Sequence, residues 1–184
     1  ILSVVNKYDV DIDFPQAVYD EIESIPQSID PSDIPNRLDI RDWQIVTIDG
    51  DDAKDLDDAI SLKKLDNGNY QLGVHIADVS FYVEEGTELN KEAIRRGTSI
   101  YLVDRVIPML PHKLSNGICS LNEGVDRYAI SCIMEINDKG QVVDHNIYPT
   151  VIRSSHRMTY NNVNAILAGH KGLKKKYSDA VELF

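Results

Sequence analysis

Residues 49–58, with the sequence DGDDAKDLDD, contain six aspartates and a single basic residue, Lys54. Two like charges about 4 Å apart repel each other by roughly 4 kcal/mol at an effective dielectric constant of about 20. Carboxylates crowded in this way must take up protons, spread into water or share a cation. Sharing a cation would make this segment a metal site.

The sequence on both sides of the acidic segment favours β-strands. Residues 43–48 are rich in β-branched side chains, and residues 59–65 form a second apolar run. Two strands joined by a short loop would bring Asp49 beside Asp57 and Asp58. Side chains alternate along a regular strand, so the loop must bend for the carboxylates to reach one cation. Mg²⁺ suits such a site, because it is a hard ion that takes oxygen ligands and keeps several waters.

Other interpretations of the acidic segment fit the sequence less well. In a calcium loop of the EF-hand type starting at Asp49, Lys54 stands where glycine is required and Ile60 where glutamate is required. A solvated acidic loop without a ligand is a further alternative, and the apolar strands on both sides weigh against it. A serine hydrolase would need a G-x-S-x-G segment, which is absent, and the five histidines have no evident serine partner.

Further strands follow along the chain. Residues 66–69 (DNGN) predict a tight hairpin turn, because Asn-Gly tolerates positive φ angles. The partner strand runs from residue 70 to about residue 83 and places His75 on the face opposite Ile76. Other extended segments are expected at residues 99–106, 127–136 and 142–152, the last two joined by a turn at residues 137–140.

Helical patterns occur at residues 15–25, 88–96 and 160–168. Thr87 is a suitable cap for the second of these helices, and Gly97 and Gly169 suit the ends of the second and third. Residues 26–36 are rich in Pro, Ser and Asp and predict a surface linker, while residues 178–184 show a helical pattern with no terminator. Antiparallel hairpins with peripheral helices predict an α+β fold with a mostly antiparallel sheet or a barrel-like core.

The composition fits one soluble domain with a substantial core. The 184 residues are 42% hydrophobic, no apolar run reaches membrane-spanning length, and the N-terminus lacks a basic start, so we expect a cytoplasmic protein. The net charge of -11 argues against a nucleic-acid partner. Basic residues nevertheless gather at Arg95, Arg96, Arg153, Arg157 and residues 174–176, so the whole-chain charge does not decide the partner.

The two cysteines, Cys119 and Cys132, are expected to be free buried thiols. Cys132 alternates with Ile130, Met134 and Ile136 as a core-facing strand residue would.

Four motifs occur in order along the chain: TIDGDDAKDLDDA at residues 47–59, HIADVS at residues 75–80, PMLP at residues 108–111 and LSNGICSL at residues 114–121. Together they closely resemble the catalytic domain of the ribonuclease II/ribonuclease R exoribonucleases, and their details are closer to the ribonuclease R branch. The resemblance covers nearly the whole chain and is strongest from about residue 38 to residue 160. Several motifs in the correct order make it highly specific.

The resemblance implies processive 3′-to-5′ hydrolysis of RNA to nucleoside 5′-monophosphates with Mg²⁺ as cofactor. The four catalytic aspartates of the family match Asp49, Asp55, Asp57 and Asp58. By similarity, Asp49 and Asp58 would hold the metal, Asp55 would help to position it, and Asp57 would be the most sensitive catalytic carboxylate. The remaining aspartates of the segment, Asp51 and Asp52, fall outside this set and are expected to be supporting or solvated.

The resemblance also suggests residues that contact RNA. Tyr101 stands where the family places an aromatic residue that stacks on a base near the 3′ end, a contact worth about 1 to 3 kcal/mol. Four further side chains are candidates for phosphate contacts or, alternatively, for a solvated face: Arg127, Arg153, Arg157 and Tyr160. His75 and Asp78 are expected to be structural hydrogen-bonding residues rather than ligands.

We expect residues 1–37 to form an N-terminal helix and linker, and residues 38–184 to form the N-terminal portion of an RNB-type catalytic domain that is incomplete at its C-terminus. An arginine, a glutamate and a second aromatic residue of the family site, with flanking cold-shock-type and OB-type RNA-binding domains, are expected elsewhere in the full-length chain. This polypeptide alone should then have little or no exonuclease activity. A non-catalytic RNA-binding module and a metal-stabilised structural domain remain the alternatives.

Overall fold

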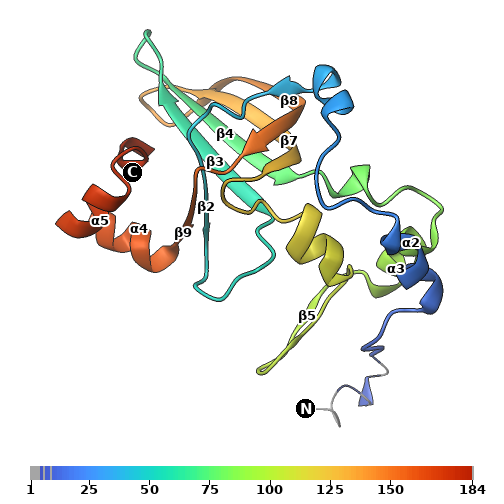
Figure 1. The fold of residues 1–184 in the computed structure, drawn as a ribbon. Helices are drawn as coiled ribbons and strands as arrows, with labels where there is room; N and C mark the ends of the chain where they lie inside the picture. Colours follow the sequence, from blue (N-terminus) through green and yellow to red (C-terminus); the bar gives the residue numbers. More distant parts are fainter. Residues whose placement is uncertain (1–4, 6, 9, 184) are drawn as a thin grey trace.

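The computed structural model describes Val5, Lys7, Tyr8 and residues 10–183, and it centres on a seven-stranded sheet (Figure 1). The strand order across the sheet is β1-β8-β7-β4-β3-β2-β9. The strands are β1 (Leu38–Asp39), β2 (Ile45–Asp49), β3 (Asp58–Lys64), β4 (Tyr70–Ala77), β7 (Asp126–Ile136), β8 (Val142–Arg153) and β9 (His156–Thr159). A separate hairpin consists of β5 (Ile100–Tyr101) and β6 (Val106–Ile107).

Most neighbouring strands of the seven-stranded sheet run antiparallel. The pairs β2–β3, β3–β4, β4–β7 and β7–β8 are antiparallel, whereas β1–β8 and β2–β9, at the two edges, are parallel. Within the described residues the edge strands β1 and β9 do not pair with each other, so the sheet is open. The predicted α+β fold with a mostly antiparallel sheet is confirmed, and the barrel-like alternative is replaced by an open sheet.

The two predicted hairpin turns are present. Residues 66–69 join β3 to β4, and Gly68 has a φ of 89°, which a side chain at this position would disfavour. Residues 137–140 join β7 to β8 in the same way.

Two predicted extended segments are shorter than expected. β4 ends at Ala77 and not near residue 83, because Asp78 forms an ion pair with Arg37 and begins the 3₁₀ turn η2 (Val79–Phe81). The apolar residues that continue the strand pattern therefore belong to this turn. The segment predicted as extended at residues 99–106 is instead the small hairpin of β5 and β6.

The three predicted helices are α2 (Gln16–Glu23), α3 (Glu88–Arg96) and α4 (Tyr160–Leu167). At the start of α3, the Thr87 hydroxyl accepts the Asn90 N–H, and Gly97 ends this helix with a φ of 73°. In the described part of the chain, no helix is long and apolar enough to cross a membrane.

Several helical segments differ from the predictions. The residues predicted as a linker contain the 3₁₀ helix η1 (Pro31–Asn36), which Asp30 caps by accepting the Ser32 N–H. The π-helical η3 (Lys113–Ile118) and the short α5 (Lys171–Lys176) were not predicted. The helical pattern expected at residues 178–184 is reduced to the 3₁₀ turn η4 (Val181–Leu183), and Phe184 lies outside the described residues.

Three apolar clusters hold these elements together. One cluster lies on one face of the sheet and includes Ile45, Ala59, Ala129 and Ile152. A second joins α2, α3 and η3 through Val18, Leu89 and Leu114. The third packs α4, α5 and η4 against β2 and β9 through Val46, Met158, Ile166 and Tyr177, and Figure 1 shows these helices beside the two strands. Strand β2 is therefore packed on both faces, because Ile45 and Val46 point to opposite sides.

A buried polar relay, defined as Ser61, His75, Ser131 and Thr150, crosses β3, β4, β7 and β8. Ser61 Oγ lies 3.0 Å from His75 Nε2, and His75 Nδ1 lies 2.8 Å from Ser131 Oγ. Ser131 Oγ lies 2.6 Å from Thr150 Oγ1, which donates to the Ala129 carbonyl. Burial lowers the pKa of His75 to about 4, so its ring is neutral at physiological pH. The structural role expected for His75 is confirmed.

Both cysteines are free thiols, as predicted. Cys119 is buried, and burial raises the pKa of its thiol to about 12. The prediction that Cys132 is also buried is wrong, because the side of β7 that it shares with Ile130 and Met134 stays half exposed. The buried side of β7 carries Ser131 instead.

Candidate active site

Strands β2 and β3 place the acidic segment at one end of the sheet, where the connection between them projects beyond the strands (Figure 1). β2 ends at Asp49 and β3 begins at Asp58, and the residues between them, 50–57, are called the acidic loop below. The two strands pair antiparallel with Val46 opposite Ile60, so the acidic loop closes this end of the pair. The predicted order of strand, loop and strand is confirmed.

The four predicted aspartates act on one another through their charges. Burial raises the pKa of Asp49, and the charges of Asp58 and Asp55 raise it further. Desolvation also raises the pKa of Asp57, whose side chain keeps an exposed edge, and the charges of Asp55, Asp58 and Asp49 add to this shift. The structure therefore brings Asp49, Asp55, Asp57 and Asp58 within range of each other's charges.

Asp49 has a carboxylate oxygen without a partner. Its Oδ2 atom is buried, and no group of the described residues hydrogen-bonds to it. Burying an unpaired charged oxygen costs free energy, and carboxylate oxygens are the ligands that Mg²⁺ prefers. The donor atoms of this cluster therefore fit a hard cation.

The carboxylates do not already form a closed coordination shell. Across the described residues, no three Asp, Glu, His or Cys side chains lie close enough together to hold a metal ion as they stand. A spread arrangement is what mutual repulsion between the carboxylates favours. The role of Mg²⁺, and of Asp49, Asp55 and Asp58 as its ligands, stays a prediction.

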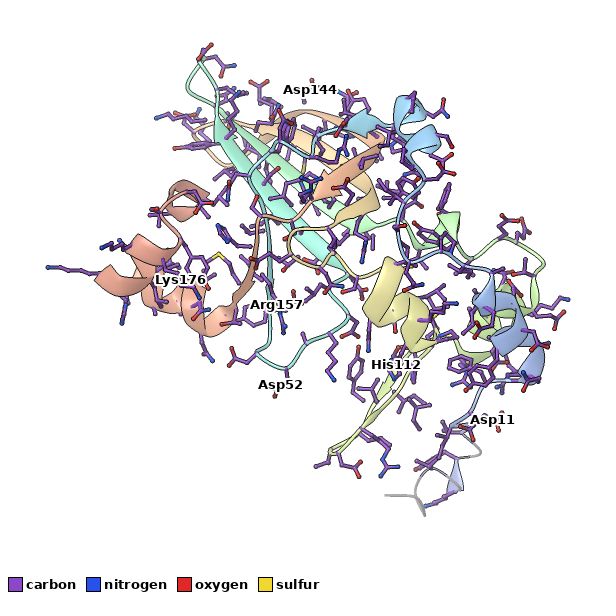
Figure 2. All side chains as sticks on the ribbon, in the orientation of Figure 1. Asp11, Asp52, His112, Asp144, Arg157 and Lys176 are labelled. Atoms are coloured by element: carbon purple, nitrogen blue, oxygen red, sulfur yellow. The ribbon has the colours of Figure 1, made fainter. Side chains whose placement is uncertain are left out.

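Arg157 holds the outer part of the acidic loop. Its Nη2 atom donates to the Asp51 carbonyl at 3.0 Å and to the Ala53 carbonyl at 2.6 Å. Asn161 Nδ2 donates to Asp51 Oδ2 at 2.7 Å, so the Asp51 carboxylate is hydrogen-bonded away from the catalytic candidates. Figure 2 shows Asp52 at the outer tip of the loop and Arg157 on the side toward the sheet.

Tyr101 approaches the site from the small hairpin. The residue is 66% exposed, and its Oη atom donates to Asp55 Oδ2 at 2.9 Å. A pocket of about 350 Å³ lies between Tyr101, Asp55 and Asp57, with an apolar wall that includes Val79 and Leu110. An exposed aromatic ring beside such a pocket is suited to stacking on a base.

The other candidates for RNA contacts differ in how accessible they are. Arg127 is only 8% exposed, and its guanidinium donates to the carbonyls of Ser120, Asp126 and Gly117. Arg153 pairs with an Asp126 carboxylate oxygen at 2.7 Å. Tyr160, the first residue of α4, is 60% exposed. Both Arg127 and Arg157 thus hold backbone carbonyls, and their predicted contacts with phosphate stay predictions.

Asp78 has a structural partner, as expected. Its Oδ2 atom lies 2.7 Å from Arg37 Nη2 in an ion pair that is almost fully buried. The Arg37 guanidinium also lies 4.2 Å from the centre of the Tyr128 ring. Arg37 had no signal in the sequence, because its partner is far away along the chain.

Sequence reasoning also missed Ser120. This residue lies in the motif at residues 114–121, yet its hydroxyl hydrogen-bonds to the backbone of the acidic loop. Its position in a motif was a signal that the residue matters, but nothing local indicated what it touches.

Comparison with known proteins places these features in a family. Residues 37–183 match the family model described as RNB domain. Ribonuclease R of Thermotoga maritima is 55% identical over 175 residues, which are 94% of this chain and 25% of that protein. Ribonuclease R 1 of Lactococcus lactis is 49% identical over 178 residues, which are 97% of this chain and 22% of that protein. The chain therefore spans about a quarter of the length of these curated relatives.

A solved structure of a ribonuclease R has a similar fold. Mycoplasma genitalium RNase R in complex with double-stranded RNA aligns with a TM-score of 0.85 at 34% identity. The alignment covers 90% of this chain and 29% of that one.

Proposed function

The chain belongs to the RNB domain family, and on that basis we propose that the full-length protein is a 3′-to-5′ exoribonuclease. It would hydrolyse RNA processively to nucleoside 5′-monophosphates with Mg²⁺ as cofactor. The relatives named ribonuclease R support this proposal, since they match almost the whole chain.

The observation that carries the proposal is the cluster of carboxylates at the ends of β2 and β3. Burial and the charges of neighbouring carboxylates raise the pKa values of Asp49 and Asp57, and the unpaired Asp49 Oδ2 is free to bind a cation. A phosphodiester substrate brings further negative charge to the same place. We therefore expect hydrolysis at this site to need a cation.

In the proposed mechanism, Asp49 and Asp58 would hold Mg²⁺, and Asp55 would help to position it. When bound, Mg²⁺ neutralises charge on a scissile phosphate and lowers the pKa of an attacking water. The Asp57 carboxylate borders the pocket beside Tyr101 and has a raised pKa, so it is suited to accept a proton from that water.

Tyr101 would stack on a base near the 3′ end of the RNA, with the pocket next to it receiving the terminal nucleotide. Stacking accepts every base, which suits an enzyme that digests RNA generally. Tyr160 is exposed and would contact the RNA backbone, as would Arg157 if substrate binding releases its present partners.

The full-length protein is expected to carry more than this region. The relatives are about four times as long as the matched region, which supports additional domains. We expect these domains to be of the cold-shock and OB types and to bind single-stranded 3′ ends. The cytoplasm is the expected compartment.

The experiment that tests this function uses full-length protein with RNA labelled at either the 5′ or the 3′ end. Digestion of 3′-labelled RNA should release labelled mononucleotide at once, while 5′-labelled RNA should shorten without early release of label. Activity should require Mg²⁺ and disappear with a chelator. Release of internal fragments, or activity that is unchanged by a chelator, would contradict the proposal.

A further inference from the structure

One hydroxyl group, that of Ser120, joins two points on the backbone of the acidic loop. Ser120 Oγ donates to the Lys54 carbonyl at 2.9 Å and accepts the Leu56 N–H at 3.1 Å. These two backbone groups lie on either side of Asp55. Because Ser120 and Leu56 are both buried, water cannot readily replace the hydroxyl as the partner of the Leu56 N–H.

Further backbone hydrogen bonds attach the acidic loop to the core beside the Ser120 contacts. The Leu121 N–H donates to the Leu56 carbonyl at 2.9 Å, and the Ala77 N–H donates to the Asp57 carbonyl at 2.9 Å. The backbone on both sides of Asp55 and at Asp57 is therefore bonded to two separate parts of the core.

Arg127 holds the backbone of Ser120 in place. Arg127 Nε donates to the Ser120 carbonyl at 2.9 Å, and Arg127 Nη2 donates to the Gly117 carbonyl at 3.2 Å. A guanidinium group has a rigid donor geometry, so it fixes the relative position of both carbonyls. The end of η3 is thereby a fixed support for the acidic loop.

The Asp55 side chain depends on this support. Its Oδ2 atom accepts the Tyr101 hydroxyl, and repulsion from Asp49 and Asp57 pushes the carboxylate away from the cluster. Without the Ser120 hydroxyl, the Lys54 carbonyl and the N–H of the buried Leu56 would both lose this partner. The loop would then relax toward solvent, and repulsion would move Asp55 outward with it.

We propose that Ser120 is a positioning residue of the active site, whose hydroxyl holds Asp55 and its neighbours in the arrangement needed for hydrolysis. This inference rests on the proposed exoribonuclease function and deepens it. Ser120 acts through the loop backbone and touches no substrate.

The test compares Ser120→Ala with Ser131→Ala in the full-length protein. Both serines are fully buried and make two side-chain hydrogen bonds, but Ser131 belongs to the polar relay and not to the loop. Ser120→Ala should lower kcat for single-stranded RNA by about 10- to 100-fold, with KM within about threefold of wild type. Ser131→Ala should lower the melting temperature to a similar extent and leave kcat near wild type.

A second variant covers the case in which Ser120→Ala does not fold. Ser120→Cys keeps the shape of the side chain but forms weak hydrogen bonds, and it should lower kcat in the same direction by a smaller factor. A wild-type kcat in every folded Ser120 variant would overturn the inference. An equal loss of kcat in Ser131→Ala would also overturn it, because the loss would then reflect general loosening.

The same assays distinguish failure of the proposed exoribonuclease function from failure of the positioning role of Ser120. If wild-type protein does not shorten RNA from its 3′ end, the exoribonuclease proposal itself fails. If wild-type protein does so and Ser120→Ala does so equally fast, only the positioning role is lost.

Discussion

The acidic loop leads into β3, and the polar relay begins on the same strand at Ser61, but the polar atoms of the two regions differ in how completely they are hydrogen-bonded. In the relay, each of the four side chains has a hydrogen-bond partner inside the protein. In the acidic loop and its flanking residues, burial and neighbouring carboxylates raise the pKa values of Asp49 and Asp57, and Asp49 Oδ2 has no partner among the described residues.

This difference in hydrogen bonding distinguishes polar groups that stabilise the fold from polar groups that take part in the reaction. Buried polar groups with complete hydrogen bonding stabilise a particular structure. Crowded or unpaired groups cost stability, and proteins keep them mainly at functional sites. Substitutions in the relay should therefore lower stability and spare the rate, whereas substitutions among the four aspartates should do the reverse.

The largest expected effect comes from Asp57→Asn in the full-length protein. Loss of this carboxylate should slow RNA hydrolysis at least about 1,000-fold, or about 4 kcal/mol of transition-state stabilisation. The melting temperature should stay level or rise, because a raised pKa means that the charged form of Asp57 destabilises the fold. Single-turnover rates and thermal melting measure both effects.

Asp52→Asn is the matched control, since Asp52 is an exposed aspartate of the same loop. It should keep a rate near wild type. A loss of less than about tenfold for Asp57→Asn, or a similar loss for both variants, would break the distinction between the four aspartates and their neighbours.

The next largest effect is a pH dependence of the stability of the fold, caused by His75 in the polar relay. The pKa of His75 is lowered from 6.5 to about 4, so neutral His75 stabilises the fold above pH 6.5. As the pH falls from about 6.5 to about 4, up to about 3 kcal/mol of that stability should be lost. Asp49 and Asp57 have the opposite sign, because their raised pKa values make protonation favourable to the folded state.

Amide hydrogen exchange in β4, corrected for intrinsic exchange rates, would measure this dependence. The His75→Gln variant should be less stable than wild type at pH 7 and should lose less stability on acidification. An equal pH dependence in both proteins would show that the relay is not its source.

A smaller loss of stability is expected when the relay is overpacked by Gly73→Ala. A Cβ atom at this position would collide with Ser61 Oγ and would lie 2.7 Å from His75 Nε2. The cost should be about 1 to 3 kcal/mol. At Gly50, in the acidic loop, a Cβ atom would meet nothing within 4 Å, so Gly50→Ala should cost little. Equal melting temperatures for the two variants would contradict the tight packing of the relay.

The smallest effect concerns Tyr101→Phe. This change removes the hydrogen bond to Asp55 but keeps the ring, so RNA affinity should stay within about threefold of wild type. Tyr101→Ala removes the ring as well and should weaken binding by about 1 to 3 kcal/mol. Filter binding to RNA with a chelator present would measure both. Equal losses would indicate that the hydroxyl, and not stacking, provides the contact.

Local signals in the sequence predicted the local features well. The turn at residues 66–69 and the ends of α3 and α4 depend on side chains within a few positions, and all are present. The acidic segment was also recognisable locally, because its charge density and its flanking strands lie within one short stretch.

Features that depend on partners far away along the chain could not be predicted from local sequence signals. The strand β9 is short and gains its place by pairing parallel with β2, which lies about 110 residues earlier. The residues that support the acidic loop are equally remote, since Ser120 lies 64 positions from Leu56 and Arg157 lies 104 positions from Ala53. The catalytic candidates could therefore be recognised from the sequence more readily than the distant residues that position them.

The most direct test of the central claim, that the carboxylates at the ends of β2 and β3 need a shared cation, is Mg²⁺ binding without RNA. Titration calorimetry on full-length wild-type protein and on Asp49→Asn would measure it. We expect wild-type protein to bind Mg²⁺ and the variant to bind it at least about tenfold more weakly, because the unpaired Oδ2 is lost. Equal binding by the two proteins would contradict the account.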